Sequence, residues 1–138
     1  MAKLSTDIFV LCDYASVSQE QKLSIIGIFD QFFVANLPTA WPKMYLVAVV
    51  AGEAGKEYPL TLKLITPQKT ENNNFPDKEF KITLGQNGKA NVMTELVNFP
   101  LAAAGTYKVQ LVDGKELVGE LEFKVNKTTA TYEPNKVN

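Results

Sequence analysis

The stretch LAAAGTYKVQLVDG, residues 101–114, carries the clearest structural signal in the chain. Its apolar and polar side chains alternate, with Tyr107, Val109 and Leu111 between Lys108 and Gln110. A period of two is typical of a β-strand that has one face on a core and the other in water. The Asp113-Gly114 pair that follows predicts a tight hairpin turn. The stretch therefore indicates a strand that turns directly into an antiparallel neighbour.

The same alternation recurs around Leu60, Ile82 and Phe123, and turn signals divide the chain into about eight extended segments. The segments are Thr6–Tyr14, Lys22–Ala35, Lys43–Ala51, Tyr58–Thr66, Lys78–Leu84, Lys89–Phe99, Thr106–Val112 and Lys115–Asn126. Between the fifth and sixth, Gly85-Gln86-Asn87-Gly88 predicts a second hairpin. About eight short strands with closely spaced turns are typical of an all-β, antiparallel, two-sheet β-sandwich. A small barrel is the less favoured alternative.

The segment from Leu101 to Tyr107 resembles the start of a strand in immunoglobulin-like domains, where a tyrosine hydroxyl bonds to the backbone at a corner. The Cys-Trp-Cys pattern of true immunoglobulins is absent from the sequence. A length of 138 residues fits one domain. We expect a single immunoglobulin-like β-sandwich over residues 1–126 and a polar C-terminal tail over residues 127–138.

The composition excludes several kinds of chemistry. The chain has no His, which excludes Ser-His-Asp nucleophiles and His-ligated zinc. All 14 basic residues are scattered lysines and the net charge is −1, so we expect no nucleic-acid partner. Cys12 has no partner in the chain and lies in an apolar run, which favours a buried small hydrophobe. No segment approaches the roughly 20 apolar residues of a membrane span, so we expect a cytoplasmic protein without membrane contact.

Several short motifs occur in a recognisable order. They are Leu11-Cys12-Asp13-Tyr14, the run from Lys22 to Asp30, a Pro-containing loop before the run from Met44 to Val50, Phe99-Pro100, Gly105-Thr106-Tyr107 and Asp113-Gly114. This order resembles a family of small, uncharacterised bacterial proteins with predicted β-sandwich folds, over nearly the whole chain. The resemblance implies the sandwich fold. It implies no activity, cofactor or catalytic residue.

Catalysis without His would need carboxylates, as in glycoside hydrolysis. The candidates are Asp13 and Asp30, which stand at the ends of neighbouring apolar segments, although Asp at a strand end is normally a turn or capping residue. The loop Glu71-Asn72-Asn73-Asn74 with Asp77 offers oxygen ligands for calcium, but such a stretch is more often only solvated. We therefore expect no enzyme activity, metal or cofactor. The alternative is a small-ligand binder or an enzyme with a carboxylate-based pocket that no motif reveals.

The first half of the chain differs from the second because both faces of its segments are apolar. Phe9 and Leu11 alternate with Ile8, Val10 and Cys12, and Met44 and Leu46 alternate with Tyr45, Val47 and Val49. A two-layer sandwich buries only one of those faces in its own core. The sequence therefore predicts self-association, with a homodimer as the commonest form, or binding of a protein partner. The alternative is a cover by the loop from Asn36 to Trp41 or by the C-terminal tail.

The candidate interface comprises Phe32, Phe33, Trp41, Tyr45, Val47 and Val49. Consecutive Phe32 and Phe33 face opposite sides of a strand, so one of them faces the core and the other needs a cover. We interpret the sequence as a non-catalytic interaction or structural module.

Overall fold

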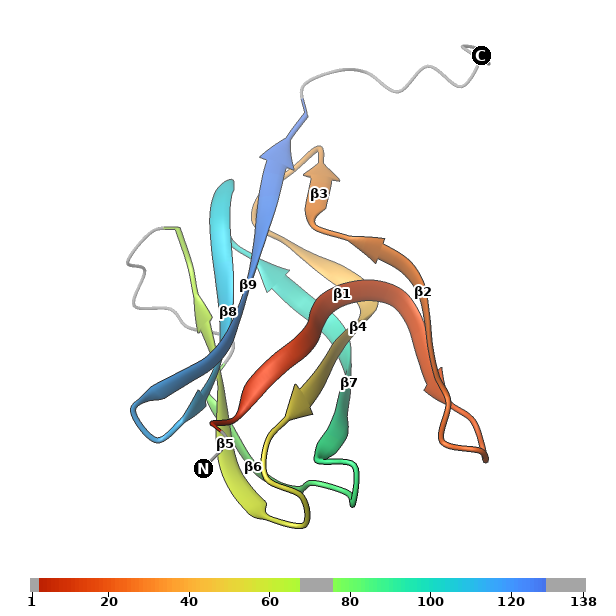
Figure 1. The fold of residues 1–138 in the computed structure, drawn as a ribbon. Helices are drawn as coiled ribbons and strands as arrows, with labels where there is room; N and C mark the ends of the chain where they lie inside the picture. Colours follow the sequence, from red (N-terminus) through yellow and green to blue (C-terminus); the bar gives the residue numbers. More distant parts are fainter. Residues whose placement is uncertain (1–2, 68–75, 129–138) are drawn as a thin grey trace.

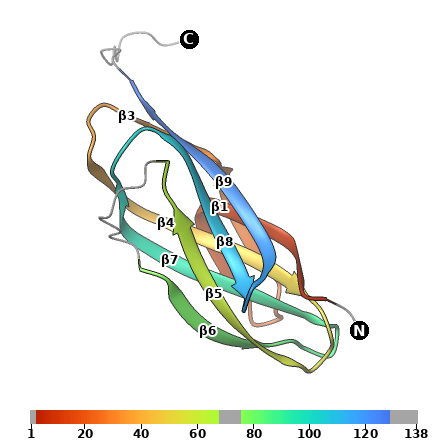
Figure 2. The same cartoon turned by 90° about the vertical axis from the view of Figure 1, so that its left-hand side faces the viewer.

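The computed structural model describes residues 3–67 and 76–128, and in them it places nine strands in two packed sheets. The first sheet contains, in spatial order, β2 (Leu23–Phe29), β1 (Ser5–Val17), β4 (Thr39–Ala51) and β7 (Lys89–Leu101). The second contains β3 (Gln31–Val34), β9 (Glu116–Lys127), β8 (Gly105–Asp113), β5 (Glu57–Ile65) and β6 (Lys78–Thr83). Figure 1 shows the strands in sequence colours, and Figure 2 shows the second sheet lying across the first. The predicted all-β, immunoglobulin-like sandwich is confirmed.

One predicted segment, Lys22–Ala35, is two strands, which is why the count is nine rather than eight. The chain leaves the first sheet after Phe29, passes through Asp30, and enters the second sheet as β3. The backbone N–H of Lys124 donates to the Asp30 carbonyl at 2.9 Å, and β3 then runs parallel to β9. The apolar pattern continues through the crossing because the residues on both sides of it face the same core, so periodicity alone does not reveal the change of sheet.

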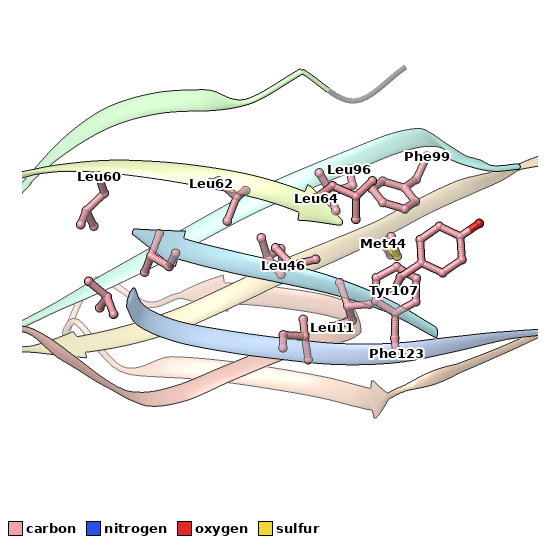
Figure 3. Packing of buried hydrophobic residues seen from close by; sticks show 14 of the residues in the cluster. Leu11, Met44, Leu46, Leu60, Leu62, Leu64, Leu96, Phe99, Tyr107 and Phe123 are labelled. Atoms are coloured by element: carbon pink, nitrogen blue, oxygen red, sulfur yellow. The ribbon is translucent and has the colours of Figure 1, made fainter. Parts of the chain in front are cut away.

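The core lies between the sheets and is built from the alternating residues that the sequence indicated. Leu60, Leu62 and Leu64 of β5, Tyr107, Val109 and Leu111 of β8, and Leu121, Phe123 and Val125 of β9 are all buried. They pack against the first sheet through Leu11, Met44, Leu46, Leu96 and Phe99 (Figure 3). The Tyr107 and Phe123 rings stack with centroids 5.0 Å apart. No polar or charged side chain of the described residues is buried in this interior.

The predicted tyrosine corner is confirmed. The Tyr107 hydroxyl donates to the Ala103 carbonyl at 2.6 Å and accepts from the Ala103 N–H at 3.1 Å. These two bonds satisfy backbone groups in the connection that carries the chain from β7 in one sheet to β8 in the other. The predicted Asp113-Gly114 turn is also present, since Gly114 has φ 62° and β8 pairs antiparallel with β9.

The second predicted hairpin is wrong. Gly85 to Gly88 does form a tight turn, in which the Gly88 N–H donates to the Gly85 carbonyl at 2.9 Å and Gly88 has φ 73°. However, the strands on its two sides lie in different sheets: β6 pairs with β5, and β7 pairs with β4. The Gly52 N–H donates to the Gly88 carbonyl at 2.8 Å, which holds the end of the turn beside β4. Turn chemistry predicted the reversal of the chain but not the sheet that receives it.

The end of the domain and two predicted loops fall partly outside the described residues. Strand β9 ends at Lys127, and the Thr128 N–H donates to the Val34 carbonyl at 2.8 Å. Most of the predicted tail, residues 129–138, lies outside the described part, as does the Glu71-Asn74 portion of the calcium candidate. Of that candidate only Asp77 is described, and it is exposed.

Candidate functional site

The outer face of the first sheet is covered in part by the β1–β2 hairpin. Cys12, Ala15 and Val47 are buried there in a second apolar cluster, separate from the main core, against which Val10, Leu23, Ile25 and Tyr45 pack. Gln21, at the tip of the hairpin, lines a hollow together with Val49 of β4 and with Lys89 and Asn91 of β7. Figure 1 shows β1 arching and the hairpin descending beside β4 and β7. The cover is therefore internal, but it comes from the first two strands rather than from the 36–41 loop.

Burial in this cluster determines the chemistry of Cys12. Its side chain is fully buried, and removal from water raises the pKa of its thiol because the thiolate is the form that loses most on desolvation. The Sγ atom lies 3.4 Å from the Tyr14 carbonyl. A buried thiol with a raised pKa is a poor nucleophile, in keeping with the small-hydrophobe interpretation.

Two of the six candidate interface residues are not on the surface, and placing them in an interface was wrong. Phe32 lies in the main core, with ring centroids 4.8 Å from Trp41 and 5.4 Å from Phe123. Val47 is fully buried beneath the hairpin. Trp41 is half-buried and packs on the main core. Alternation alone could not show the burial of Val47, because the hairpin bends back over a face that a flat sheet would expose. Phe32 faces the main core because the chain crosses into the second sheet after Asp30.

The other three candidates differ in their surroundings. Phe33 points away from Phe32, as their consecutive positions on a strand predict, and is 66% exposed on β3. Val49 is half-buried near the hairpin tip. Tyr45 is half-buried, and its ring makes an edge contact with Tyr14 at a centroid distance of 5.4 Å. Of these three, Tyr45 is the one whose ring contacts an exposed aromatic side chain, that of Tyr14.

We define the tyrosine face as Tyr14, Ile26, Lys43, Tyr45, Met93, Glu95 and Val97. The register places Tyr14 opposite Ile26, Tyr45 opposite Glu95, and Lys43 opposite Val97. A contact between the Tyr14 and Tyr45 rings joins the first pair to the others, and Met93 is two residues before Glu95 on the same face of β7. Directly opposed residues of antiparallel strands share one face. The exposed fractions of the four apolar or aromatic side chains at its margins are 48% for Tyr14, 58% for Ile26, 41% for Met93 and 58% for Val97.

A polar network lies in the middle of the tyrosine face. The Tyr45 hydroxyl donates to Glu95 Oε2 at 2.9 Å, and Lys43 Nζ lies 3.3 Å from the same oxygen. The hydrogen bond from Tyr45, then that from Lys43, lowers the pKa of Glu95, since both favour the carboxylate. Their bonds to Glu95 raise the pKa of Lys43 and of Tyr45 in turn. Glu95 and Lys43 are therefore a neutral pair in an otherwise apolar surface.

Six of the seven residues of the tyrosine face were not among the candidates predicted from the sequence: Tyr14, Ile26, Lys43, Met93, Glu95 and Val97. A signal for them was present in Met93, Glu95 and Val97, which alternate with Thr94 and Leu96 along one strand. Leu96 of this strand faces the core, and successive side chains of a strand point to opposite faces. Met93 and Val97 are therefore apolar side chains on the face that is in contact with water. Tyr14 could not be placed without the bend in β1.

The carboxylates proposed from sequence are not shown as a pair. Asp13 stands beside Gly27, where a Cβ at Gly27 would meet the Asp13 side chain, and Gly27 has φ 73°. Asp30 instead lines a hollow of about 350 Å³ with Glu122, and the other lining residues are Val10, Ile28, Phe29 and Leu121. A second hollow beside it shares Asp30 and Glu122 and adds Gln31 and Lys124. The partner of Asp30 in any acidic pocket is thus Glu122.

Within residues 3–67 and 76–128, no three Cys, Asp or Glu side chains are grouped so that they could hold a metal ion. The same residues contain no helix long and apolar enough to cross a membrane.

Comparison with solved structures finds this chain similar to parts of larger proteins and to one small protein. An immunoglobulin-like protein from Pseudomonas aeruginosa is 19% identical, with a TM-score of 0.47, and the match covers 91% of this chain and 98% of that one. A β-glucosidase from Listeria innocua in complex with isofagomine is 8% identical, with a TM-score of 0.51, over 94% of this chain and 17% of the enzyme. An alkylpurine DNA glycosylase from Pseudomonas fluorescens is 11% identical, with a TM-score of 0.50, over 91% and 31%.

The matches with TM-scores of 0.50 and 0.51 show the fold alone, because their identities are 11% and 8%. Among curated proteins, no sequence matches the chain. The family comparison is more informative, since residues 7–126 match a family of unknown function, DUF6941. That match includes all nine strands of the described residues except the first two residues of β1 and the last of β9. The chain is therefore a member of the DUF6941 family, whose function is unknown.

Proposed function

We propose that this protein is a non-catalytic interaction module that binds a second copy of itself or another protein through the tyrosine face. The observation that supports the proposal is the gathering of Tyr14, Ile26, Met93 and Val97, all exposed, around one neutral polar network. Contiguous apolar patches are uncommon on monomers and often mark interaction surfaces. Tyrosine is enriched at the centres of interfaces because its ring buries a large area while its hydroxyl retains a partner.

The free energy of association would come from burial of the apolar margin of the tyrosine face rather than of its polar centre. Apolar area removed from water contributes about 25 cal/mol per Å², so a few hundred Å² on each partner supplies several kcal/mol before the cost of association. The Lys43–Glu95 pair contributes little to affinity while exposed, but it fixes the position of Tyr45 and disfavours partners that bring an unpaired charge.

Cross-linking in the organism that makes the protein tests this function. The unmodified full-length chain should give a cross-linked species, composed of two copies or of one copy and a partner. Val97→Glu places an unpaired charge on the tyrosine face and should abolish that species. Leu117→Glu is the matched control, because Leu117 is equally exposed but belongs to the second sheet. The proposal is overturned if the unmodified chain, Val97→Glu and Leu117→Glu all give the same cross-linked species. It is also overturned if none of the three gives a cross-linked species.

A second candidate function is binding of a small cationic ligand in the hollow at Asp30 and Glu122. The observation in its favour is that two carboxylates and the apolar side chains of Ile28, Phe29 and Leu121 line the same hollow. A primary alkylammonium ion would place its charge between the carboxylates and its alkyl chain against these apolar side chains. NMR titration with butylammonium should shift amides next to Asp30 and Glu122, and Asp30→Asn should remove the shifts. Unchanged spectra at every concentration would exclude this candidate.

A further inference from the structure

The two sheets have four edge strands in the described residues, and three of them are protected against pairing with another chain. Strand β2 contains Gly27 at φ 73°, which departs from extended geometry in mid-strand. Strand β3 has only four residues. Strand β6 has six residues, among them Lys78, Glu79 and Lys81. Short length, irregular backbone and charge are the usual means by which proteins prevent edge-to-edge association.

The fourth edge, β7, is neither short nor irregular over its central part, and the one charged side chain there, Glu95, is paired with Lys43. It is 13 residues long and pairs with β4 on one side, while no strand of the described residues pairs with its other side. The hairpin tip overlies its beginning, where Gln21 shares a hollow with Lys89 and Asn91. Near its end Asn98 has φ 53°, which interrupts the extended geometry. Between these two interruptions lies an open stretch from Val92 to Val97 that includes two exposed apolar side chains, Met93 and Val97.

We propose that two copies of this chain associate by antiparallel pairing of β7 with β7, centred on Glu95, which joins their first sheets into one. This inference rests on the proposed function and identifies the partner as a second copy. A two-fold axis at Glu95 places Met93 of each copy opposite Val97 of the other, so exposed apolar side chains meet in two symmetric pairs. The same register leaves the hairpin tip and Asn98 at the margins of the paired segment.

The charges at the axis are compatible with this register. Glu95 faces its own copy there, and opposed like charges are normally unfavourable. However, in each copy Lys43 Nζ lies 3.3 Å from the Glu95 carboxylate of the same chain, and the Tyr45 hydroxyl of that chain donates to the same carboxylate. Two neutral Lys43–Glu95 pairs therefore meet at the axis. Lys43→Gln should weaken the association, and adding Glu95→Gln to that variant should restore part of it.

A charge-exchange experiment tests the register. Within one chain Met93 and Val97 are four residues apart, about 13 Å along the strand, so charges introduced at both positions do not reach each other inside a monomer. Met93→Lys alone and Val97→Glu alone should each weaken the dimer at least about tenfold, because each places a charge opposite an apolar side chain. The double variant should recover the dimer, because every introduced lysine faces an introduced glutamate. Light scattering of the native mass, against 15.3 kDa for one chain, reads the result.

Mixing the two single variants gives an independent readout. The register predicts a preferred heterodimer, in which one oppositely charged pair and one Met93–Val97 pair form. Two results together would overturn the β7 pairing and leave the proposed function standing. Neither the double variant nor the mixture would associate, and Val97→Glu would still abolish cross-linking in cells. A monomeric chain that cross-links to a different protein through the tyrosine face would also overturn the β7 pairing and leave the proposed function standing. A chain that neither dimerises nor cross-links overturns both.

Discussion

At the scale of single residues, Tyr107 has the most demanding position in the fold. It is buried, its ring stacks on Phe123, and its hydroxyl makes both of its bonds to the Ala103 backbone. Tyr107→Phe retains the ring but leaves a carbonyl and an N–H of a partly buried connection without that partner. We expect a loss of about 1–3 kcal/mol in the free energy of unfolding.

Urea denaturation of Tyr107→Phe and Tyr45→Phe, compared with the native chain, tests this expectation. Tyr45 also makes a hydrogen bond through its hydroxyl, but to the exposed Glu95 side chain, where water replaces the lost partner. Its substitution should therefore have the smaller effect on stability. Equal losses for the two variants would show that the corner hydroxyl has no special role.

Glu95 gives a second prediction at this scale, from the sign of its pKa shift. The Tyr45 hydrogen bond is the largest cause that lowers the pKa of Glu95 below its ordinary value of 4.5. A carboxyl with a lowered folded-state pKa contributes stability that is present above its unfolded pKa and lost as the pH falls through the folded pKa. Tyr45→Phe should raise the Glu95 pKa toward 4.5 and reduce the loss of stability below that pH.

Carbon-13 NMR titration of the Glu95 side chain measures this pKa directly. Glu120 is a suitable internal control, because its carboxylate accepts from Gln110 at 2.8 Å and does not contact Tyr45. An unchanged Glu95 midpoint in Tyr45→Phe would contradict the assignment of the shift to the Tyr45 hydroxyl.

At the scale of elements, the β1–β2 hairpin decides which part of the first sheet is available. Its inner side chains, Leu23 and Ile25, pack against the cluster that buries Cys12 and Val47. Val47→Lys places an unpaired charge in that cluster, so we expect it to destabilise the fold by about 3 kcal/mol or more. Val97→Lys, on the exposed side of the neighbouring strand, should leave the stability of the monomer nearly unchanged.

The labelling rate of Cys12 by a thiol reagent reports opening of the hairpin. The native thiol should react slowly, because it is fully buried and its pKa is raised by desolvation. Ile25→Ala removes part of the cover and should accelerate labelling by promoting local opening. Ile26→Ala is the matched control, since the Ile26 side chain is exposed. Equal acceleration by both variants, or by neither, would contradict the cover described for Cys12.

The same element shows how far the sequence predicts this structure. Alternation around Val109 and Phe123 predicted buried strands because each has one polar face, and the corner at Tyr107 has a recognisable pattern. The crossing at Asp30 and the folding back of the hairpin were not predictable in this way. Both depend on where the backbone bends, and apolar residues precede and follow each bend. Phe32 and Val47 were placed in an interface for that reason.

At the scale of the whole molecule, the two sheets differ in how well their edges are protected against pairing with another chain. The second sheet ends in the short strands β3 and β6. The first has its centre covered by its own hairpin and its β7 margin uncovered by any described strand. This asymmetry is the structural feature on which the proposed association through β7 rests.

The native mass of the unmodified full-length chain, measured by light scattering across a range of concentrations, tests association through this margin most directly. Association in the micromolar range corresponds to about −8 kcal/mol, which an interface of modest area provides. The account predicts a mass of twice 15.3 kDa at concentrations above that range, falling to 15.3 kDa on dilution. A mass of 15.3 kDa at every concentration up to about 1 mM would contradict it.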